Sequence, residues 1–131
     1  AQNKFSLLVH KTPTCGCCKK WVKHLEANSF STMIKDHQNL QKVKDQYSIK
    51  PKYQSCHTAV SQDGYIFEGH IPSKFIKQFL ANPEADAIGL SVPGMPLGSP
   101  GMEVEGRFMP YDVLVIYKDG SSKVYAEVRK L

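Results

Sequence analysis

The chain has 131 residues, of which 41% are hydrophobic and 22% are charged, and its formal net charge at pH 7 is +5. This length allows one domain with a hydrophobic core of its own, and the composition excludes an intrinsically disordered chain. No apolar run approaches the length of a membrane-spanning helix, so the sequence predicts no membrane span.

The positive charge is concentrated in the first part of the chain. Residues 1–52 carry ten lysines and three acidic residues, a net charge of +7, whereas residues 53–131 carry seven basic and nine acidic residues, a net charge of −2. A basic surface can contact nucleic acid or anionic lipid. These lysines are scattered, however, and no aromatic residues are interleaved with them, so we expect a solvated surface and no nucleic-acid partner.

The N-terminal segment predicts a strand and then a helix, with three cysteines between them. Residues 5–9 are apolar, as in a buried strand, and residues 19–28 have helical spacing. Cys15, Cys17 and Cys18 stand at the junction, where the unpaired N–H groups of the first helical turn stabilise a thiolate. A Cys-x-x-Cys pair after a strand indicates redox or metal chemistry. Because consecutive helical residues point about 100° apart, we expect Cys17 to point away from the helix face that carries Cys18.

Strands and helices alternate through the middle of the chain. Residues 31–35 predict a second strand, and residues 40–47 predict a second helix. Residues 58–60 and 65–68 predict two strands joined by a Gln-Asp-Gly hairpin turn. A third helix follows, with Ser73 as its expected N-cap.

This order, β-α-β-α-β-β-α over about residues 4–82, resembles the thioredoxin-like fold, an α/β class with a mixed sheet and flanking helices. Redox proteins of that fold carry a cis-proline just before the third core strand, packed against the cysteine pair. Here Cys56 stands at that place, and no proline does. The resemblance therefore predicts that Cys56 lies against Cys15 and Cys18, so that four thiols converge.

Residues 83–111 differ in kind from the rest of the chain. They hold five prolines and five glycines, so we expect a long irregular loop, and such loops are usually functional. Two Pro-Gly-Met units place Met95 and Met102 after turn residues. Residues 112–128 then predict a β-hairpin added to the sheet. No linker indicates a second domain, and we expect residues 1–131 to form a single domain.

Most of the candidate ligands are soft. Four cysteines together with Met95 and Met102 favour Cu(I), because thiolates and thioethers select this ion. Zinc also accepts four cysteines, but the adjacent Cys17 and Cys18 are hard to arrange around one tetrahedral ion. Clustered thiolates are better suited to bridging several Cu(I) ions. An iron–sulfur cluster would need four well-spaced cysteines, and the spacing here does not favour one.

The five histidines differ in their surroundings. His70 lies at a strand-to-helix turn and is the best candidate for a ligand or proton donor. His57 follows Cys56 directly, so one of these two side chains is free to point away from the site. The other histidines lack a motif and are expected at the surface, and one methionine in a predicted strand is expected in the core: His10, His24, His37 and Met33.

Four stretches carry the most distinctive residues: TPTCGCCKKW at 12–21, SCHTAV at 55–60, EGHIP at 68–72 and VPGMPLGSPGME at 92–103. Together they resemble the CopG-like family of periplasmic copper-resistance proteins, long described as a domain of unknown function. The resemblance implies a thioredoxin-like fold, a cleaved signal peptide, copper binding through the cysteines and a role in copper redox handling. It also implies copper ions and other periplasmic copper-resistance proteins as partners. The start at Ala1, without an initiator Met, fits a removed signal peptide.

Three functions remain open from the sequence. The first is a periplasmic copper-binding protein that holds one or several Cu(I) ions and interconverts Cu(I) and Cu(II), with catalytic turnover left open. The second is a thiol–disulfide oxidoreductase in which Cys15 and Cys18 are catalytic, and spare thiols beside the pair count against it. The third is a structural disulfide protein. We favour the first, with these metal ligands: Cys15, Cys17, Cys18, Cys56, His70, Met95 and Met102.

Overall fold

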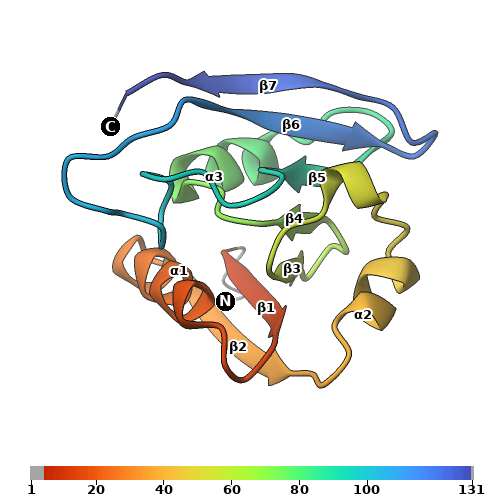
Figure 1. Cartoon of the computed structure of the whole chain (residues 1–131). Coiled ribbons are helices and arrows are strands. Elements are labelled where there is room, and N and C mark those ends of the chain that lie inside the picture. Colours follow the sequence, from red (N-terminus) through yellow and green to blue (C-terminus); the bar gives the residue numbers. More distant parts are fainter. Residues whose placement is uncertain (1–4, 131) are drawn as a thin grey trace.

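The computed structural model describes residues 5–130, which form a seven-stranded mixed sheet with helices beside it (Figure 1). The strands lie in the order β2-β1-β3-β4-β5-β6-β7. The chain start at Ala1 lies outside the described residues. None of the described helices has the length and apolar character needed to cross a membrane. In chain order, the elements are β1 (Ser6–Lys11), α1 (Gly16–Ala27), β2 (Ser31–Asp36), α2 (Gln41–Gln46), the 3-10 helix η1 (Pro51–Tyr53), β3 (Thr58–Ser61), β4 (Ile66–Glu68), α3 (Ser73–Ala81), β5 (Ala87–Ser91), β6 (Tyr111–Tyr117) and β7 (Ser122–Val128).

The sheet contains both parallel and antiparallel pairs. β1 pairs in parallel with β2, and β4 pairs in parallel with β5. A parallel pair needs a long crossover connection, which α1 and α3 provide. β3 pairs antiparallel with both β1 and β4, and β6 and β7 continue the sheet antiparallel beyond β5. The mixed α/β sheet with flanking helices that the sequence predicts is confirmed.

Helices α1 and α3 cover one face of the sheet with their apolar sides. Trp21 and Leu25 of α1 and Ile76 and Phe79 of α3 are fully buried. They lie in one core cluster with Phe67 of β4. Burial of large apolar side chains is the main favourable term in folding, and it fixes both helices against the sheet.

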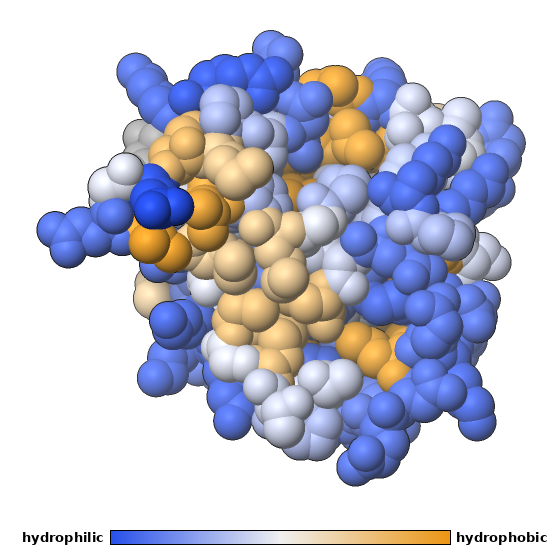
Figure 2. All heavy atoms as spheres, viewed as in Figure 1, coloured by the Kyte–Doolittle hydropathy of each residue, from blue (hydrophilic) through white to orange (hydrophobic). Residues whose placement is uncertain are grey.

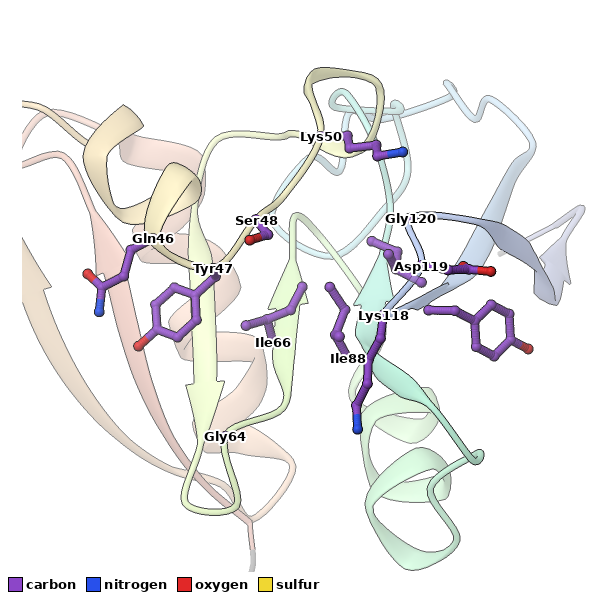
Figure 3. A pocket seen from close by; sticks show the side chains of 12 residues that line it. Gln46, Tyr47, Ser48, Lys50, Gly64, Ile66, Ile88, Lys118, Asp119 and Gly120 are labelled. Carbon is purple, nitrogen blue, oxygen red and sulfur yellow. The ribbon is translucent and has the colours of Figure 1, made fainter.

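The other face of the sheet is covered only in part. Ile66 and Ile116 form a smaller cluster there with Ile49 and Tyr53, from the chain around η1. Figure 1 shows α2 on the opposite side of β1 from α1. A hollow of about 430 Å³ lies beside this cluster, and Ile66, Ile88 and Ile116 are among its lining residues (Figure 3). Its lining includes no cysteine or histidine, so it is separate from the predicted site.

The stretch at residues 83–111 is not irregular throughout, and this part of the prediction is wrong. It contains β5, which pairs with β4 on one side and with β6 on the other. Gly89 lies inside this short strand, and glycine lowers the strand propensity of a segment. For this reason the sequence pattern did not predict β5. The glycine is needed, because a Cβ on Gly89 would lie 1.7 Å from the backbone oxygen of Ile66.

The hydrophobic core also extends beyond residue 82. Leu90 of β5 and Val113 and Val115 of β6 are fully buried. The hairpin predicted at residues 112–128 is confirmed as β6 and β7, which extend the sheet. Met33, by contrast, is 72% exposed, because β2 is an edge strand with five of its six residues exposed. The prediction that Met33 is in the core is therefore wrong.

Four strand ends meet at one edge of the sheet. His10 near the end of β1 pairs with Thr58 at the start of β3, and Thr58 also pairs with Glu68 at the end of β4. Glu68 in turn pairs with Ser91 at the end of β5. The connections that leave or enter the sheet here are the cysteine turn, the segment before β3, the turn after β4 and the loop after β5. The topology therefore brings the predicted site residues to one place.

Candidate metal centre

The first cysteine pair lies at the N-terminus of α1. Cys15 is the N-cap residue, and its Sγ accepts a hydrogen bond from the backbone N–H of Cys18 at 3.2 Å. The two sulfurs form a disulfide bond. Cys18 is fully buried, whereas Cys15 is half-buried. In the reduced state, the helix N-terminus favours the thiolate form of this pair.

Cys17 faces the other cysteines, contrary to the expectation that it points elsewhere. Its Sγ lies 3.5 Å from Cys15 Sγ and 3.8 Å from Cys56 Sγ. Cys15 precedes the helix, and Cys56 comes from the segment before β3. Cys17, in the first turn of α1, therefore contacts sulfur atoms from two different parts of the chain. The ligand atoms of the four cysteines, Cys18 included, all lie within 4.8 Å of one another. The predicted convergence of the four cysteines is confirmed, with Cys15 and Cys18 joined as a disulfide and Cys17 and Cys56 free.

Two imidazoles lie against the same sulfurs. His70 Nε2 is 3.0 Å from Cys56 Sγ, and His57 Nδ1 is 3.3 Å from both Cys56 Sγ and Cys18 Sγ. Cys56, His57 and His70 therefore form a second group of candidate ligands. Sequence reasoning did not select His57, because consecutive residues of an extended chain point apart. The chain bends at Cys56, however, and β3 begins only at Thr58, so both side chains face the site.

Backbone carbonyls determine which nitrogen of each imidazole carries the proton. His70 Nδ1 is 2.6 Å from the oxygen of Pro100, and His57 Nε2 is 2.8 Å from the oxygen of Gly69. A carbonyl oxygen only accepts, so these nitrogens donate and the other nitrogen of each ring presents a lone pair to the sulfurs. Burial lowers the pKa of His57 and of His70, which keeps both rings neutral. A neutral imidazole oriented by a carbonyl is suited to metal binding.

Cys56 is the residue common to both groups of candidate ligands. Burial, and then the neighbouring Cys17, raise the pKa of the Cys56 thiol to about 12. Without a cation nearby, this sulfur therefore keeps its proton. A bound metal ion stabilises the thiolate, so metal binding at Cys56 would release a proton.

The loop that follows β5 covers the cysteines. The hydroxyl of Ser55 donates a hydrogen bond to the oxygen of Gly94, and the N–H of Gly94 donates to the oxygen of Gln54 at 3.3 Å. These bonds hold Met95 beside the thiols, with its Sδ 4.0 Å from Cys17 Sγ. Figure 2 shows moderately hydrophobic atoms, in pale orange, gathered over the N-terminal end of α1 and this loop, with hydrophilic margins in blue.

The same loop makes a second close approach further along the chain. Gly101 has a φ of +91°, and a Cβ there would lie 2.7 Å from the oxygen of Cys17 and 2.9 Å from His70 Nδ1. Glycine is therefore required if the loop is to pack against both. Met102 is half-buried, and its N–H donates to the oxygen of Ser99 at 2.8 Å. Of the two loop methionines, Met95 is the one whose sulfur contacts a cysteine sulfur in the described residues.

A buried ion pair lies behind Cys56. Lys44 and Glu68 are both buried and form a salt bridge. The Glu68 carboxylate also accepts hydrogen bonds from the backbone N–H of Ser55 at 2.8 Å and from the Thr58 hydroxyl. It thus joins the segment before β3 to the end of β4, and these two segments carry the site. Sequence reasoning missed this pair, because neither residue belongs to a metal-binding pattern.

The histidines expected at the surface make structural contacts. His10 is buried, so that expectation is wrong, and its Nδ1 is 2.8 Å from His37 Nε2. His24 Nε2 accepts a hydrogen bond from the N–H of Ser73 at 3.1 Å. The N-cap of α3 is Pro72, so Ser73 is the first helical residue and not the predicted cap. His24 therefore satisfies an N–H group that the end of a helix leaves unpaired.

Comparisons with known proteins show which proteins this chain resembles. A family model described as a protein of unknown function, DUF411, matches residues 53–102, which span the segment from η1 to Met102. Two solved structures of copper resistance protein CopG, form 1 and form 2, are each 39% identical to this chain, with TM-scores of 0.90. The similarity covers 97% of this chain for form 2, 98% for form 1, and 100% of each solved chain. No curated protein matches the chain.

Proposed function

The chain belongs to the CopG copper-resistance protein family, and we propose that it binds Cu(I) at the cysteine cluster as part of copper resistance. One observation carries this proposal: four cysteine sulfurs lie together, with two imidazoles beside them. Thiolates and thioethers select Cu(I), and imidazole also binds copper. The inner part of this sulfur-rich site, at Cys18, His57 and His70, is fully buried.

The sulfur separations fit metal ions bound between them. Two sulfurs bound to one ion at about 2.3 Å each lie about 3.5–4.6 Å apart for angles from about 100° to 180°. In the structure, the separations are 3.8 Å for Cys17–Cys56 and 4.0 Å for Cys17–Met95. Cys15 Sγ lies 3.5 Å from Cys17 Sγ and becomes a ligand once its disulfide with Cys18 is reduced. The thioether favours copper over zinc, because zinc prefers thiolate, imidazole and carboxylate.

The position of Cys56 supports the binding of more than one ion. Its sulfur belongs both to the four-cysteine group and to the group with two imidazoles, and a thiolate can bridge two ions. We propose a thiolate-bridged Cu(I) cluster in which Cys56 is the bridge and Met102 is the second thioether of the covering loop. The full proposed ligand set is Cys15, Cys17, Cys18, Cys56, His57, His70, Met95 and Met102.

We propose that the same site interconverts Cu(I) and Cu(II) through Cys15 and Cys18. Oxidation of the two thiols to a disulfide releases two electrons and two protons. The electrons reduce two Cu(II) ions to Cu(I), and the protons pass to solvent. The Cys15–Cys18 disulfide supports this step, and the free Cys17 and Cys56 remain to hold Cu(I). An external dithiol is needed to restore the reduced pair.

We propose that the protein acts in the periplasm, together with other copper-resistance proteins of that compartment. Disulfide bonds form and persist there, whereas the cytosol keeps thiols reduced. The Cys15–Cys18 bond is compatible with such a location.

An anaerobic Cu(I) titration of the reduced protein, followed by X-ray absorption, tests the proposal. We expect at least one copper per chain with sulfur as the main ligand, and a short copper–copper distance if the thiolates bridge. Mild oxidation, confirmed by a thiol count, should lower the copper bound, since a disulfide removes two thiolates. Less than one copper per chain with zinc preferred would overturn the proposal.

A thiol–disulfide oxidoreductase is the second candidate, and the Cys15–Cys18 disulfide at the N-terminus of α1 favours it. Two observations count against it. Residues 5–130 contain no cis peptide bond, and Cys17 Sγ lies 3.5 Å from Cys15 Sγ, where it can attack the disulfide. Insulin reduction separates the two functions, because robust turnover by the metal-free protein would favour the oxidoreductase.

A further inference from the structure

We propose that Met95 is the first protein ligand that incoming Cu(I) meets, and that the ion then passes inward to Cys17 and Cys56. This inference rests on the proposed function as a Cu(I)-binding protein and adds a direction of entry to it. It also names the class of partner: a carrier that holds Cu(I) on soft ligands and releases it by ligand exchange at Met95.

The soft ligands form a series from the surface to the interior. Met95 is 51% exposed, Cys17 and Cys56 are half-buried, and His70 is fully buried. The contacts along this series are 4.0 Å from Met95 Sδ to Cys17 Sγ, 3.8 Å to Cys56 Sγ and 3.0 Å to His70 Nε2. Each next ligand is therefore close enough to share the ion before the previous ligand releases it.

Exposure of a methionine alone would mean little, because single exposed apolar residues are common on protein surfaces. Met95 differs because its backbone is held in place. The backbone oxygen of Gly94 accepts a hydrogen bond from the Ser55 hydroxyl, and the N–H of Gly94 donates one to the oxygen of Gln54. The segment that fixes Met95 is thus the one that leads into Cys56, so the entry ligand and the bridging thiol are positioned together.

The chemistry of the two sulfur types favours the same order. A thioether carries no proton, so Met95 can bind Cu(I) without a deprotonation step. A cysteine binds a soft metal ion as the thiolate, so Cys17 and Cys56 each lose a proton as they bind the ion. A neutral ligand at the surface and thiols beneath it would separate capture of the ion from proton release.

Each transfer step is a ligand exchange in which copper remains Cu(I). At the surface, a copper–sulfur bond to Met95 forms as the bond to the carrier's ligand breaks. In the next step, a bond to the Cys17 sulfur forms, the bond to Met95 breaks, and the Cys17 proton passes to solvent. Transfer to Cys56 follows in the same way. Because no electron moves, the step needs no oxidant or reductant.

Anaerobic stopped-flow transfer from the Cu(I)–bicinchoninate complex to the reduced protein tests the inference. Met95→Leu removes the sulfur but keeps a similar shape. We expect the uptake rate to fall by about tenfold or more. This fall should exceed any loss in the copper bound per chain at saturation, because the cysteines and imidazoles still hold the ion. The matched control is Met109→Leu, because Met109 is 52% exposed and should leave the rate unchanged.

The outcomes separate this inference from the proposed function. If the parent loads copper and Met95→Leu loads it at the same rate, the entry role is wrong and Cu(I) binding stands. An equal slowing by Met109→Leu would also overturn it, because the effect would then follow from exposed sulfur in general. If the reduced parent takes up no copper, both proposals fall together.

Discussion

Two groups of imidazoles in this protein use their ring nitrogens in different ways. In the cysteine cluster, His57 and His70 each donate an N–H to a backbone carbonyl and direct the other nitrogen at sulfur. In the second group, His10 and His37 form a hydrogen bond with each other, with 2.8 Å between His10 Nδ1 and His37 Nε2. His10 Nε2 is buried without a hydrogen-bond partner among the described residues.

The difference shows that residue type alone does not make a metal site. The carbonyls behind His57 and His70 hold the N–H of each ring and leave the other nitrogen facing sulfur. A metal ion can therefore take the place of the Cys56 thiol proton without breaking either carbonyl hydrogen bond. At the His10–His37 pair, a metal ion would first have to break the bond between the rings. The cluster is also supported from behind by Glu68, which accepts the N–H of Ser55. We therefore expect metal binding at the cluster and a packing role for the pair.

The support behind the cluster gives the largest expected effect. Lys44→Met leaves the Glu68 carboxylate buried without its cation, and loss of one partner of a buried pair costs about 3–5 kcal/mol of unfolding free energy. Chemical denaturation of the reduced, metal-free protein measures this. Lys44→Met combined with Glu68→Gln should recover part of the loss, because the unpaired charge is removed.

Lys123→Met is the control for this prediction. Lys123 pairs with Glu84 at the surface, and exposed pairs contribute little, so stability should stay close to that of the parent. If Lys44→Met were as mild as Lys123→Met, the ion pair behind Cys56 would not be a support of the site.

The shared thiol gives the next largest effect. Cys56→Ser replaces the sulfur common to both ligand groups with a hydroxyl of similar size that binds Cu(I) poorly. We expect Cu(I) affinity to fall by more than about 100-fold, which exceeds the usual loss from supporting residues. His37→Gln, at the other imidazole group, should leave the affinity unchanged. Competition with a chromophoric Cu(I) chelator measures both, and equal losses would contradict the contrast between the two groups.

The covering loop gives a smaller effect. Gly101→Ala places a Cβ against the oxygen of Cys17 and against His70, so the loop must lift and the Pro100 carbonyl must leave His70. We expect about a tenfold loss of Cu(I) affinity, as for other residues that orient a ligand. Gly106→Ala is the control, because Gly106 also has a positive φ but has open space around its Cβ position. A loss shared by both variants would point to backbone strain alone.

The sequence predicts the order of elements well, because strand and helix periodicity and the Asp-Gly turn are local signals. It does not reveal β5, since the need for Gly89 there comes from the close approach of Ile66, which is distant in sequence. Met33 is misplaced for a related reason. Alternation identifies a strand, but position at the edge of the sheet decides whether its residues are covered.

At the site, the sequence identifies the residues better than it identifies their directions. The four cysteines converge as expected, because the pairing of β1 with β3 brings the segment before Thr58 beside the turn that follows β1. The facing directions of Cys17 and His57 follow from a helix end and a bend, which periodicity does not describe. Lys44 and Glu68 carry no motif, and only the fold brings them together behind Cys56.

The pH dependence of stability separates the two imidazole groups most finely. Burial, then the charges of His37 and Lys35, lower the pKa of His10 below its ordinary value of 6.5. In the unfolded chain His10 takes up a proton near that ordinary value, while the folded protein still resists it. The unfolding free energy is therefore full above about pH 6.5 and falls as the pH drops below it, until the folded pKa is reached. His57 and His70, whose pKa values are also lowered by burial, add to the same fall.

In His10→Gln, only the His10 part of the fall disappears, so this variant should lose less stability than the parent between about pH 7.5 and pH 5. His37→Gln removes one cause of the lowered pKa and should lie between the two. Denaturation of the reduced, metal-free proteins at both pH values measures this, and Cu(I) affinity at the higher pH should be the same for all three. A loss of copper binding in His10→Gln would place the pair in the metal site and remove the distinction between the two groups.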